Sequence, residues 1–479
     1  MKLLKVYDSA IVKMGEHGLR NVMKLVSEPK ETTTIKNTGG LIEKYGIYEL
    51  TKPNYEKPCF AMKMKGKPIC FVKEVKNPNQ NLIVHPVEKV PWELPTEPQP
   101  YENVETLWNE VKQCIHDHVD LPEPEAYDVL TAWVFASWQL EKWTIAPYLF
   151  MFGTFATGKT RALEVLSKLC SRGWLALYMT PASLYRPIES WKPTLFLDES
   201  EIYGDKHEIL GLLNGSYRRG QYVARQRETD GDYETVFFDC FSFKAIAGTK
   251  ELAKTLQSRC IIFRTSHATR KIKFFIDEQR CTTLRNKLLM WRFDTMLEGT
   301  EGTEAFSERA DQLVEQIGYQ REVELFYPLI SVAPNKEIEQ KLIKYAKTSA
   351  TQKFEELSLT SEATCLSAIL QAKERGFMHD GRLLIQDITN IVNENISIEE
   401  RWRERYTSSL CTRLGFQRSR GSKGKAVILW SNPLVERLKK DLRYALCFSQ
   451  ALSETPSERS VPSPPPSSDW LKHSKEVQT

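Results

Sequence analysis

The chain has 479 residues, which is too many for one hydrophobic core, so we expect about three domains. Hydrophobic residues make up 41% and charged residues 27%, as in ordinary soluble proteins, and 66 Lys and Arg nearly balance 62 Asp and Glu. This balance excludes a nucleic-acid-binding charge spread over the whole chain, so any such surface has to be a local patch. The ten cysteines form no C-x-x-C pair, and no apolar run approaches the roughly 18 residues of a membrane span. These features predict a cytoplasmic protein with reduced thiols, neither secreted nor embedded in a membrane.

Residues 1–97 are rich in strand-forming patterns and predict a small accessory domain. The clearest pattern is 59–72, where two apolar runs flank Lys65-Gly66-Lys67-Pro68 as in a hairpin. A Pro-rich stretch at 90–100 reads as a linker. From residue 102 the apolar period becomes helical, and two helices over about 104–119 and 123–143 are expected to brace the domain that follows.

The apolar run Tyr148–Phe152 has the length of a buried strand and leads into GTFATGKT at 153–160. This is the phosphate-binding pattern G-x-x-x-x-G-K-[ST], in which glycines let consecutive backbone N–H groups face one phosphate. Lys159 would place its charge on the β and γ oxygens, and Thr160 would give a hydroxyl ligand to Mg²⁺. We therefore expect ATP and Mg²⁺ as cofactors. The predicted nucleotide contacts are Gly153, Thr154, Phe155, Ala156, Thr157, Gly158, Lys159, Thr160 and Arg161.

Two later strands supply polar groups at their ends. The run 193–199 ends in Asp198-Glu199, which we expect to hold Mg²⁺ and to activate water, respectively, although adjacent carboxylates also occur in plain turns. The run 241–247 ends near Thr249, which is placed to touch the γ-phosphate or the attacking water. Five strands separated by helices or long loops predict a parallel sheet covered on both faces, and so an α/β fold. Between them, a basic stretch with Arg218, Arg219 and Arg225 is either a loop facing a central channel or an ordinary solvated loop.

The C-terminal third predicts a separate basic domain. Helices are expected over 361–375, 386–395 and 398–414, followed by a hairpin through 416–430, which is the pattern of a winged helix. The domain serves DNA binding or, as the alternative, protein contacts. The predicted nucleic-acid contacts are Arg401, Arg405 and Arg413 on the third helix and Arg418, Arg420, Lys423 and Lys425 on the wing. The final stretch, 446–479, is rich in Ser and Pro and predicts a disordered tail.

Together these motifs resemble those of the AAA+ P-loop ATPases, with GTFATGKT at 153–160, LFLDE at 195–199, Thr249 and Ser258-Arg259-Cys260. The family more often has Asn where this chain has Thr249. The resemblance implies a nucleotide-binding core at 146–270 followed by a helical lid at 271–355. From the patterns above we expect a helical brace at 98–145 before this core and the winged helix at 356–445 after the lid. The resemblance further implies that Arg259 reaches the ATP of a neighbouring subunit in a ring, which we expect to be a hexamer, and that Arg321 is a second sensor of the nucleotide.

More narrowly, the chain is similar to helicase-like replication ATPases of plasmids, viruses and integrated elements. The function expected from this resemblance is a ring-forming DNA helicase or DNA-replication ATPase, with DNA and replication proteins as partners. A first alternative is an ATP-dependent loader or switch that assembles a partner on DNA without unwinding it. A second alternative is an ATPase that remodels protein partners.

Overall fold

The computed structural model of the protein divides into two compact units, Met1–Ala346 and Lys347–Thr479. Four predictions from the sequence lie outside the described residues: those for Glu199, for Lys423, for the first 32 residues and for the C-terminal tail after residue 448. The structure describes residues 33–42, 45–53, 57–77, 82–176, 181–198, 207–229, 232–297, 303–358, 360–394, 397, 400–421, 424–441, 444, 447 and 448.

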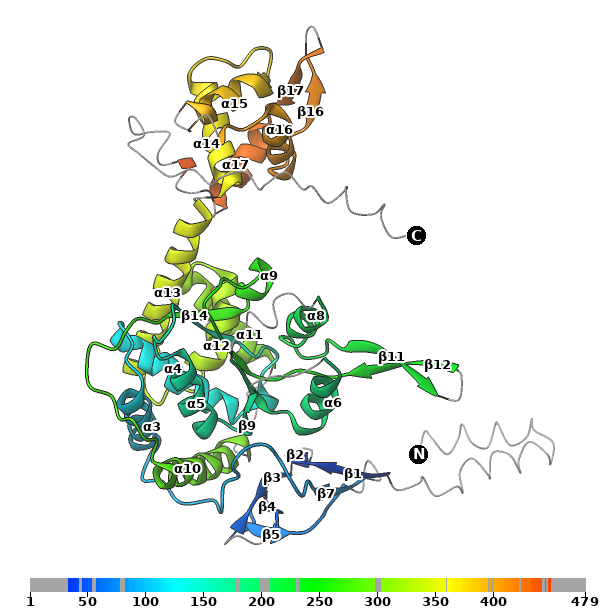
Figure 1. Ribbon diagram of the computed structural model, residues 1–479, viewed down its shortest axis with the longest axis vertical. Helices are drawn as coiled ribbons and strands as arrows, with labels where there is room; N and C mark the ends of the chain where they lie inside the picture. Colours follow the sequence, from blue (N-terminus) through cyan, green and yellow to red (C-terminus); the bar gives the residue numbers. More distant parts are fainter. Residues whose placement is uncertain are drawn as a thin grey trace, which may run out of the picture. The chain divides into compact units, whose positions relative to one another are not determined.

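A five-stranded sheet in the order β14-β8-β13-β10-β9 forms the centre of the first unit (Figure 1). Every pair of neighbours in it is parallel. The strands are short, nearly continuous apolar runs, which is typical of a sheet buried on both faces. The prediction of a five-stranded parallel sheet is therefore confirmed. The strands are β8 (Tyr148–Phe152), β9 (Gly173–Ala176), β10 (Thr194–Leu197), β13 (Lys244–Gly248) and β14 (Cys260–Arg264).

Two helices precede the sheet in the chain, α3 (Val104–His118) and α4 (Pro124–Ser137). Asn103 caps α3 by accepting a hydrogen bond from the backbone N–H of Thr106, and a proline opens the first turn of α4. From α4, Trp133 packs edge-on against Phe196 and Phe243, with ring centroids 5.9 and 5.5 Å apart. Helix α4 thus lies against the sheet, while α3 packs against α4, α5 and α10.

The other helices of the first unit fill the spaces between strands and follow the last one. Their bounds are α5 (Lys159–Leu169), α6 (Pro181–Trp191), α8 (His207–Gly215), α9 (Lys254–Gln257), α10 (Glu278–Leu297), α11 (Thr303–Ile317), α12 (Gln320–Ile330) and α13 (Lys336–Ser358).

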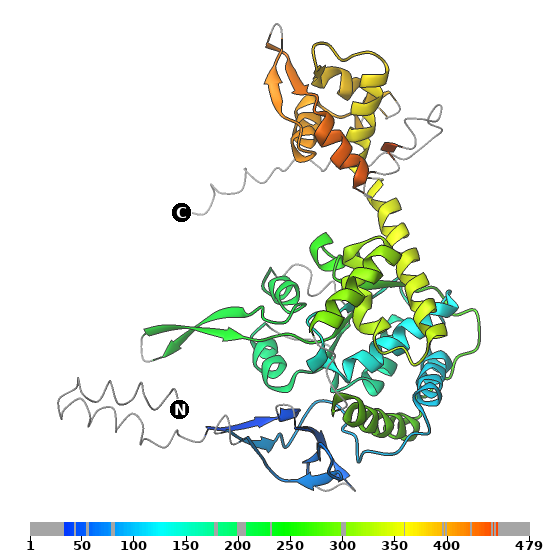
Figure 2. The same cartoon turned by 180° about the vertical axis from the view of Figure 1, so that it is seen from behind.

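An antiparallel hairpin of β11 (Val223–Thr229) and β12 (Asp232–Phe238) projects from the body of the first unit (Figures 1 and 2). The sequence predicted only a basic loop here. Strand β11 was missed because its residues are mostly charged and polar and give it no apolar face, while β12 places Tyr233 and Phe237 on one face among polar residues. Tyr222, Tyr233 and Phe237 are exposed on and beside this hairpin.

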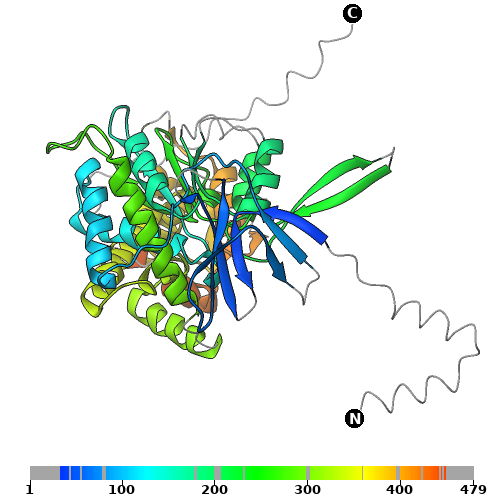
Figure 3. The same ribbon diagram turned by 90° about the horizontal axis from the view of Figure 1, so that it is seen from below.

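Residues 33–86 form two small sheets below the central one in Figure 1 and in front in Figure 3. Strands β2 (Gly39–Ile42), β3 (Gly46–Thr51), β4 (Cys59–Met64) and β5 (Cys70–Val72) make an antiparallel meander. The second sheet has the order β1-β7-β6 and consists of β1 (Thr33–Asn37), β6 (Val75–Asn77) and β7 (Leu82–Pro86).

A buried network of ion pairs joins the β2–β5 meander to the rest of the first unit. Glu49 of β3 accepts hydrogen bonds from Arg172 at 2.6 and 2.7 Å, and Arg292 of α10 lies 3.4 Å from the same carboxylate. Arg292 also pairs with Glu141 at 2.8 Å. Burial alone would raise the pKa of Glu141, but the charge and hydrogen bond of Arg292 outweigh it and lower that pKa to about 2. Glu141 is therefore charged at neutral pH.

Besides the end of α13, the described part of the second unit contains four helices and a small antiparallel sheet in the order β15-β17-β16. Its core holds side chains from all four helices and from the sheet, among them Leu366, Ile388, Leu410, Leu438 and Ile428. In the described parts of both units no helix is long and apolar enough to cross a membrane. The elements are α14 (Ser361–Glu374), β15 (Arg382–Leu384), α15 (Ile385–Asn393), α16 (Glu404–Arg413), β16 (Arg418–Arg420), β17 (Ala426–Leu429) and α17 (Asn432–Lys440).

The third helix of this unit begins later than the sequence predicted, at Glu404 instead of residue 398. Arg401 consequently lies before the helix, while Arg405 and Arg413 lie on it. Trp402 explains the difference, because it is only 3% exposed and its backbone N–H and C=O both bond to the side chain of Asn393. These contacts fix the chain in a non-helical approach to α16.

Candidate nucleotide-binding site

The loop 153–160 connects β8 to α5, and it needs its two glycines because one has no room for a side chain and the other has a left-handed backbone conformation. A Cβ on Gly153 would lie 2.3 Å from Thr265 Oγ1 and 2.5 Å from the Thr265 carbonyl oxygen. Gly158 has a φ of +83°, and Ala156 has a φ of +60°. Residues in the left-handed conformation just before a helix direct consecutive backbone N–H groups to one side. This arrangement forms an anion-binding concavity. Thr265 also bonds to Thr157 through its hydroxyl at 2.8 Å, a contact that the sequence did not reveal.

Two side chains of the loop make contacts suited to binding phosphate and metal. Lys159 curls back over the loop, where its Nζ donates to the carbonyl oxygens of Gly153 and Thr154 at 2.9 and 2.5 Å. Thr160 donates from its hydroxyl to a carboxylate oxygen of Asp198 at 2.8 Å. A hydroxyl and a carboxylate oxygen side by side are hard oxygen ligands of the kind that Mg²⁺ prefers. The structure thus brings together the two predicted metal ligands, although they are 38 residues apart.

The carboxyl edge of the sheet gathers the other predicted groups of this site. Thr249 directly follows β13, whose last residue Gly248 pairs with Phe152 at the start of the loop. Phe155 is 82% exposed at the turn of the loop. Arg161 pairs with Glu164 at 3.0 Å and also donates to the carbonyl oxygen of Phe274 at 2.7 Å.

Arg259 lies at the opposite edge of the sheet. It directly precedes β14, whose first residue Cys260 pairs with Tyr148, the first residue of β8, whereas the phosphate loop follows the last residue of β8. Five residues of strand separate the two levels, or roughly 16 Å at about 3.3 Å per residue. Burial and the nearby charge of Arg321 lower the pKa of Arg259.

Arg321 lies beside Arg259 and away from the phosphate loop of its own chain. Its Nε donates to the Ser258 carbonyl oxygen at 3.0 Å, and it pairs with Glu324. Both guanidinium groups lie over the ring of Tyr217, at 4.7 Å for Arg321 and 5.8 Å for Arg259. The role of Arg321 as a second sensor stays a prediction, and the structure places its side chain beside the turn before β14. No local sequence pattern indicates that Tyr217 lies at the centre of this cluster.

The three arginines predicted to contact nucleic acid in the first unit all bond within their own chain. Arg218 pairs with Glu324 at 2.9 Å. Arg219 donates to the carbonyl oxygens of residues 140 and 143 at 2.7 and 2.8 Å and lies 4.7 Å over the Phe241 ring. Arg225 bonds to the Tyr185 hydroxyl and lies over its ring. Arg219 and Arg225 thus hold the base of the β11–β12 hairpin, which differs from the freely solvated loop considered from sequence.

In the second unit the described basic residues are exposed, and three of them contact neighbouring elements. Arg413 pairs with Glu362 at 3.2 Å, Arg418 donates to Ser408 of α16 at 3.1 Å, and Lys425 donates to Gln386 of α15 at 3.1 Å. The last two contacts hold the β16–β17 hairpin beside the second and third helices. The exposed basic residues of the prediction are Arg401, Arg405, Arg413, Arg418, Arg420 and Lys425.

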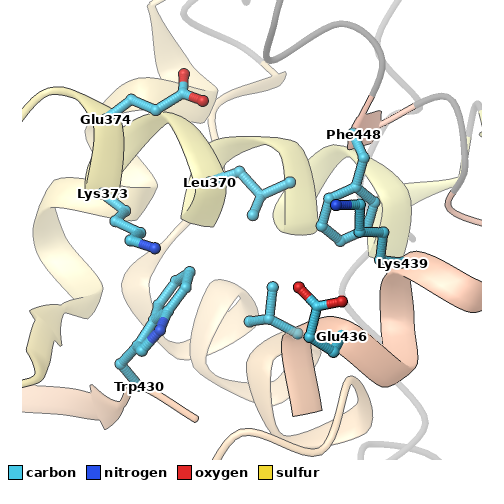
Figure 4. Close-up of a pocket in the computed structure, with 8 residues that line it drawn as sticks. Leu370, Lys373, Glu374, Trp430, Glu436, Lys439 and Phe448 are labelled. Atoms are coloured by element: carbon cyan, nitrogen blue, oxygen red, sulfur yellow. The ribbon is translucent and has the colours of Figure 1, made fainter. Parts of the chain in front are cut away.

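A hollow of about 240 Å³ lies between α14 and α17 of this unit (Figure 4). Lys373 sits 4.4 Å over the ring of Trp430 at its rim. The volume is below the roughly 300–1,000 Å³ of small-molecule sites, so we assign no ligand to it. The lining residues are Leu370, Lys373, Glu374, Trp430, Val435, Glu436, Lys439 and Phe448.

Comparison with protein-family models found no match, and comparison with curated proteins found none either. Among solved structures, the chain is similar to the apo A form of the NrS-1 C-terminal region, with 10% identity and a TM-score of 0.33, over 80% of this chain and 96% of that one. It is also similar to Cch of SCCmec type IV, described as an active helicase, with 11% identity and a TM-score of 0.41, over 88% of this chain and 83% of that one. Likenesses of this degree carry no conclusion about function, which has to come from the residues.

Proposed function

We propose that the first unit is an ATPase of the AAA+ type and that the protein is a ring-forming DNA helicase or DNA-replication ATPase. The observation that carries the proposal is the 2.8 Å contact between Thr160 and Asp198 at the end of the loop 153–160. It joins a phosphate-binding loop to an acidic strand end at the carboxyl edge of a parallel sheet, where open α/β sheets bind their ligands.

The residues of the loop and the strand ends have separate tasks in this proposal. Thr160 and Asp198 would hold Mg²⁺, which when bound neutralises charge on the β and γ phosphates. Lys159 adds its own charge to the same oxygens. Glu199 accepts a proton from the attacking water, and Thr249 orients that water.

Arg259 supports the ring. It cannot reach the phosphate loop of its own chain from the opposite edge of the sheet, so a role in hydrolysis requires that it serve a neighbouring copy. A guanidinium supplied in this way stabilises the charge on the transferring phosphoryl group. Arg321, Arg218 and Glu324 would then shape the face on which the neighbour's nucleotide rests.

The DNA-binding part of the proposal rests on the second unit. Three helices followed by a basic hairpin match a winged helix, in which a helix enters the major groove and the hairpin follows the backbone. The exposed basic residues of α16 and β16 supply the charge that phosphates require.

One observation favours the alternative of a loader or switch that does not unwind DNA. The β11–β12 hairpin carries Glu228 and Glu234 along its strands, and the basic residues Arg219 and Arg225 at its base are bonded to their own chain. A strand-tracking element is expected to be basic. An unwinding assay on a forked duplex separates the two functions.

The deciding experiment measures ATP hydrolysis with and without single-stranded DNA, duplex DNA and RNA. Lys159→Ala is expected to abolish hydrolysis, while Lys89→Ala, at an exposed lysine of the N-terminal part, serves as the matched control. Wild-type activity in Lys159→Ala would refute the ATPase. A rate indifferent to every nucleic acid would point instead to remodelling of protein partners.

A mixing experiment tests the ring. Lys159→Ala and Arg259→Ala are each expected to be inactive, but a mixed ring contains interfaces in which an intact phosphate loop faces an intact Arg259. Partial recovery on mixing is the expected result. Full activity of Arg259→Ala alone would exclude its role.

A further inference from the structure

The segment 265–277 joins β14 to α10 and carries two exposed phenylalanines. Phe274 is 76% and Phe275 is 82% exposed, and their rings meet edge to face at 4.8 Å. Two adjacent aromatic rings left this open require an explanation, because each exposes a large apolar face to water.

Contacts along the segment hold it in place. Asp120 accepts hydrogen bonds from Thr269 at 2.7 and 3.1 Å and from Arg270 at 3.1 Å. Asp117 pairs with Lys273 and with Arg280, both at 2.7 Å. Burial would raise the pKa of Asp117, but hydrogen bonds from Lys273 and other donors outweigh it and hold that pKa well below its usual range. The anchoring carboxylate therefore stays charged at neutral pH.

Both ends of the segment touch the phosphate-loop region. At the first end, Thr265 bonds to Thr157 of the loop. Near the other end, the Phe274 carbonyl oxygen accepts from Arg161, the residue directly after Thr160, and the Phe275 carbonyl oxygen lies 3.2 Å from His118 Nε2. The backbone of the two phenylalanines is thus fixed at the first turn of α5.

The order of the strands decides which part of a nucleotide comes to this place. Asp198 and Thr249 follow β10 and β13 on one side of β8, whereas the segment follows β14 on its other side. The metal and the γ-phosphate belong on the side of Asp198. The sugar and base are at the other end of the triphosphate, so they leave the loop on the side of β14.

We infer that Phe274 and Phe275 form an aromatic subsite that stacks on the base of the bound nucleoside triphosphate. The inference rests on the proposed ATP binding and deepens it. Stacking is suited to this position because every base offers a flat π face and the backbone that carries the two rings is already held in place.

The test compares two probes on the full chain: Mg²⁺-ATP, and Mg²⁺-tripolyphosphate, which lacks sugar and base. The variant Phe274→Leu/Phe275→Leu keeps apolar side chains but removes both rings. Its affinity for ATP is expected to fall between about fivefold and a hundredfold, in line with the usual cost of losing a stacked base. Its affinity for tripolyphosphate is expected to stay within about twofold of wild type. The single variant Phe275→Trp keeps an aromatic ring at both positions and should retain ATP affinity.

Tyr45→Leu provides the matched control, since Tyr45 is 61% exposed in the turn between β2 and β3. An ATP affinity of the double variant equal to that of wild type would overturn the inference. So would a parallel loss of tripolyphosphate binding, which would mean that the pair shapes the loop. Unchanged affinities with weakened self-association in sedimentation would assign the pair to a contact between copies. If wild-type protein binds neither probe, it is the proposed ATP binding itself that fails.

Discussion

Replacing Arg292 by methionine is expected to destabilise the first unit strongly at neutral pH. Arg292 is 1% exposed and stands between Glu49, 3.4 Å away, and Glu141, 2.8 Å away. Methionine fills similar space but leaves the buried carboxylate of Glu49 and the partly buried one of Glu141 with less compensation. Breaking a buried pair in this way typically costs about 3–5 kcal/mol.

The pKa of Glu141 gives a second measure of the same effect. Its depression from 4.5 to about 2 corresponds to about 3 kcal/mol of stabilisation of the charged form. Because the folded-state pKa is the lower one, this stability is fully present above pH 4.5 and is lost as the pH falls towards 2. The difference between wild type and Arg292→Met should therefore shrink over that window.

Urea unfolding followed by tryptophan fluorescence is the suitable assay, because eight of the eleven tryptophans precede residue 347. The double variant Glu141→Gln/Arg292→Met removes both partners and should recover part of the loss. A free energy of unfolding within about 0.5 kcal/mol of wild type for Arg292→Met, or a difference that does not change with pH, would refute the reasoning.

Three other outcomes are expected. Gly153→Ala should weaken ATP binding in a titration and cost about 1–3 kcal/mol in thermal unfolding, because its Cβ would overlap Thr265; an unchanged ATP affinity would count against the tight loop. Burial lowers the pKa of Lys244 to about 7, so the stability of wild type relative to Lys244→Met should rise by on the order of 3–5 kcal/mol from pH 7 to 10.5, and a flat difference in urea titrations would contradict this. Arg405→Ala should reduce the salt dependence of DNA binding by about one phosphate contact, whereas Lys439→Ala on α17 should not, and equal slopes for both would argue against α16 as the DNA-facing helix.

The local motifs of the central sheet were predictable, because each strand is an apolar run with its own boundaries. The phosphate-binding loop and the acidic strand end could each be recognised from a few adjacent residues. The β11–β12 hairpin escaped prediction because β11 is mostly charged and polar, although Tyr233 and Phe237 alternate along β12 and Asp230-Gly231 is a common turn pair.

Contacts between distant segments could not be predicted. Glu49 and Arg172 are 123 residues apart, and no sequence pattern around either residue indicates its partner. Arg321 looked like a sensor only by its place after the sheet, and its actual neighbours come from the turn before β14 and from Tyr217. Likewise Arg161 meets the Phe274 carbonyl across 113 residues. Chain topology, and not residue type, decides such pairs.

Arg259 and Thr160 lie at opposite edges of one sheet, so the proposed ATPase activity would depend on the protein concentration. If Arg259 serves a neighbouring copy, as proposed, each chain would offer half of a reaction centre on either side, and a solitary copy would have none that is whole. Turnover per chain would rise steeply with protein concentration and fall away below the concentration at which copies associate. One damaged copy in a closed assembly would disable two centres, its own and that of its neighbour.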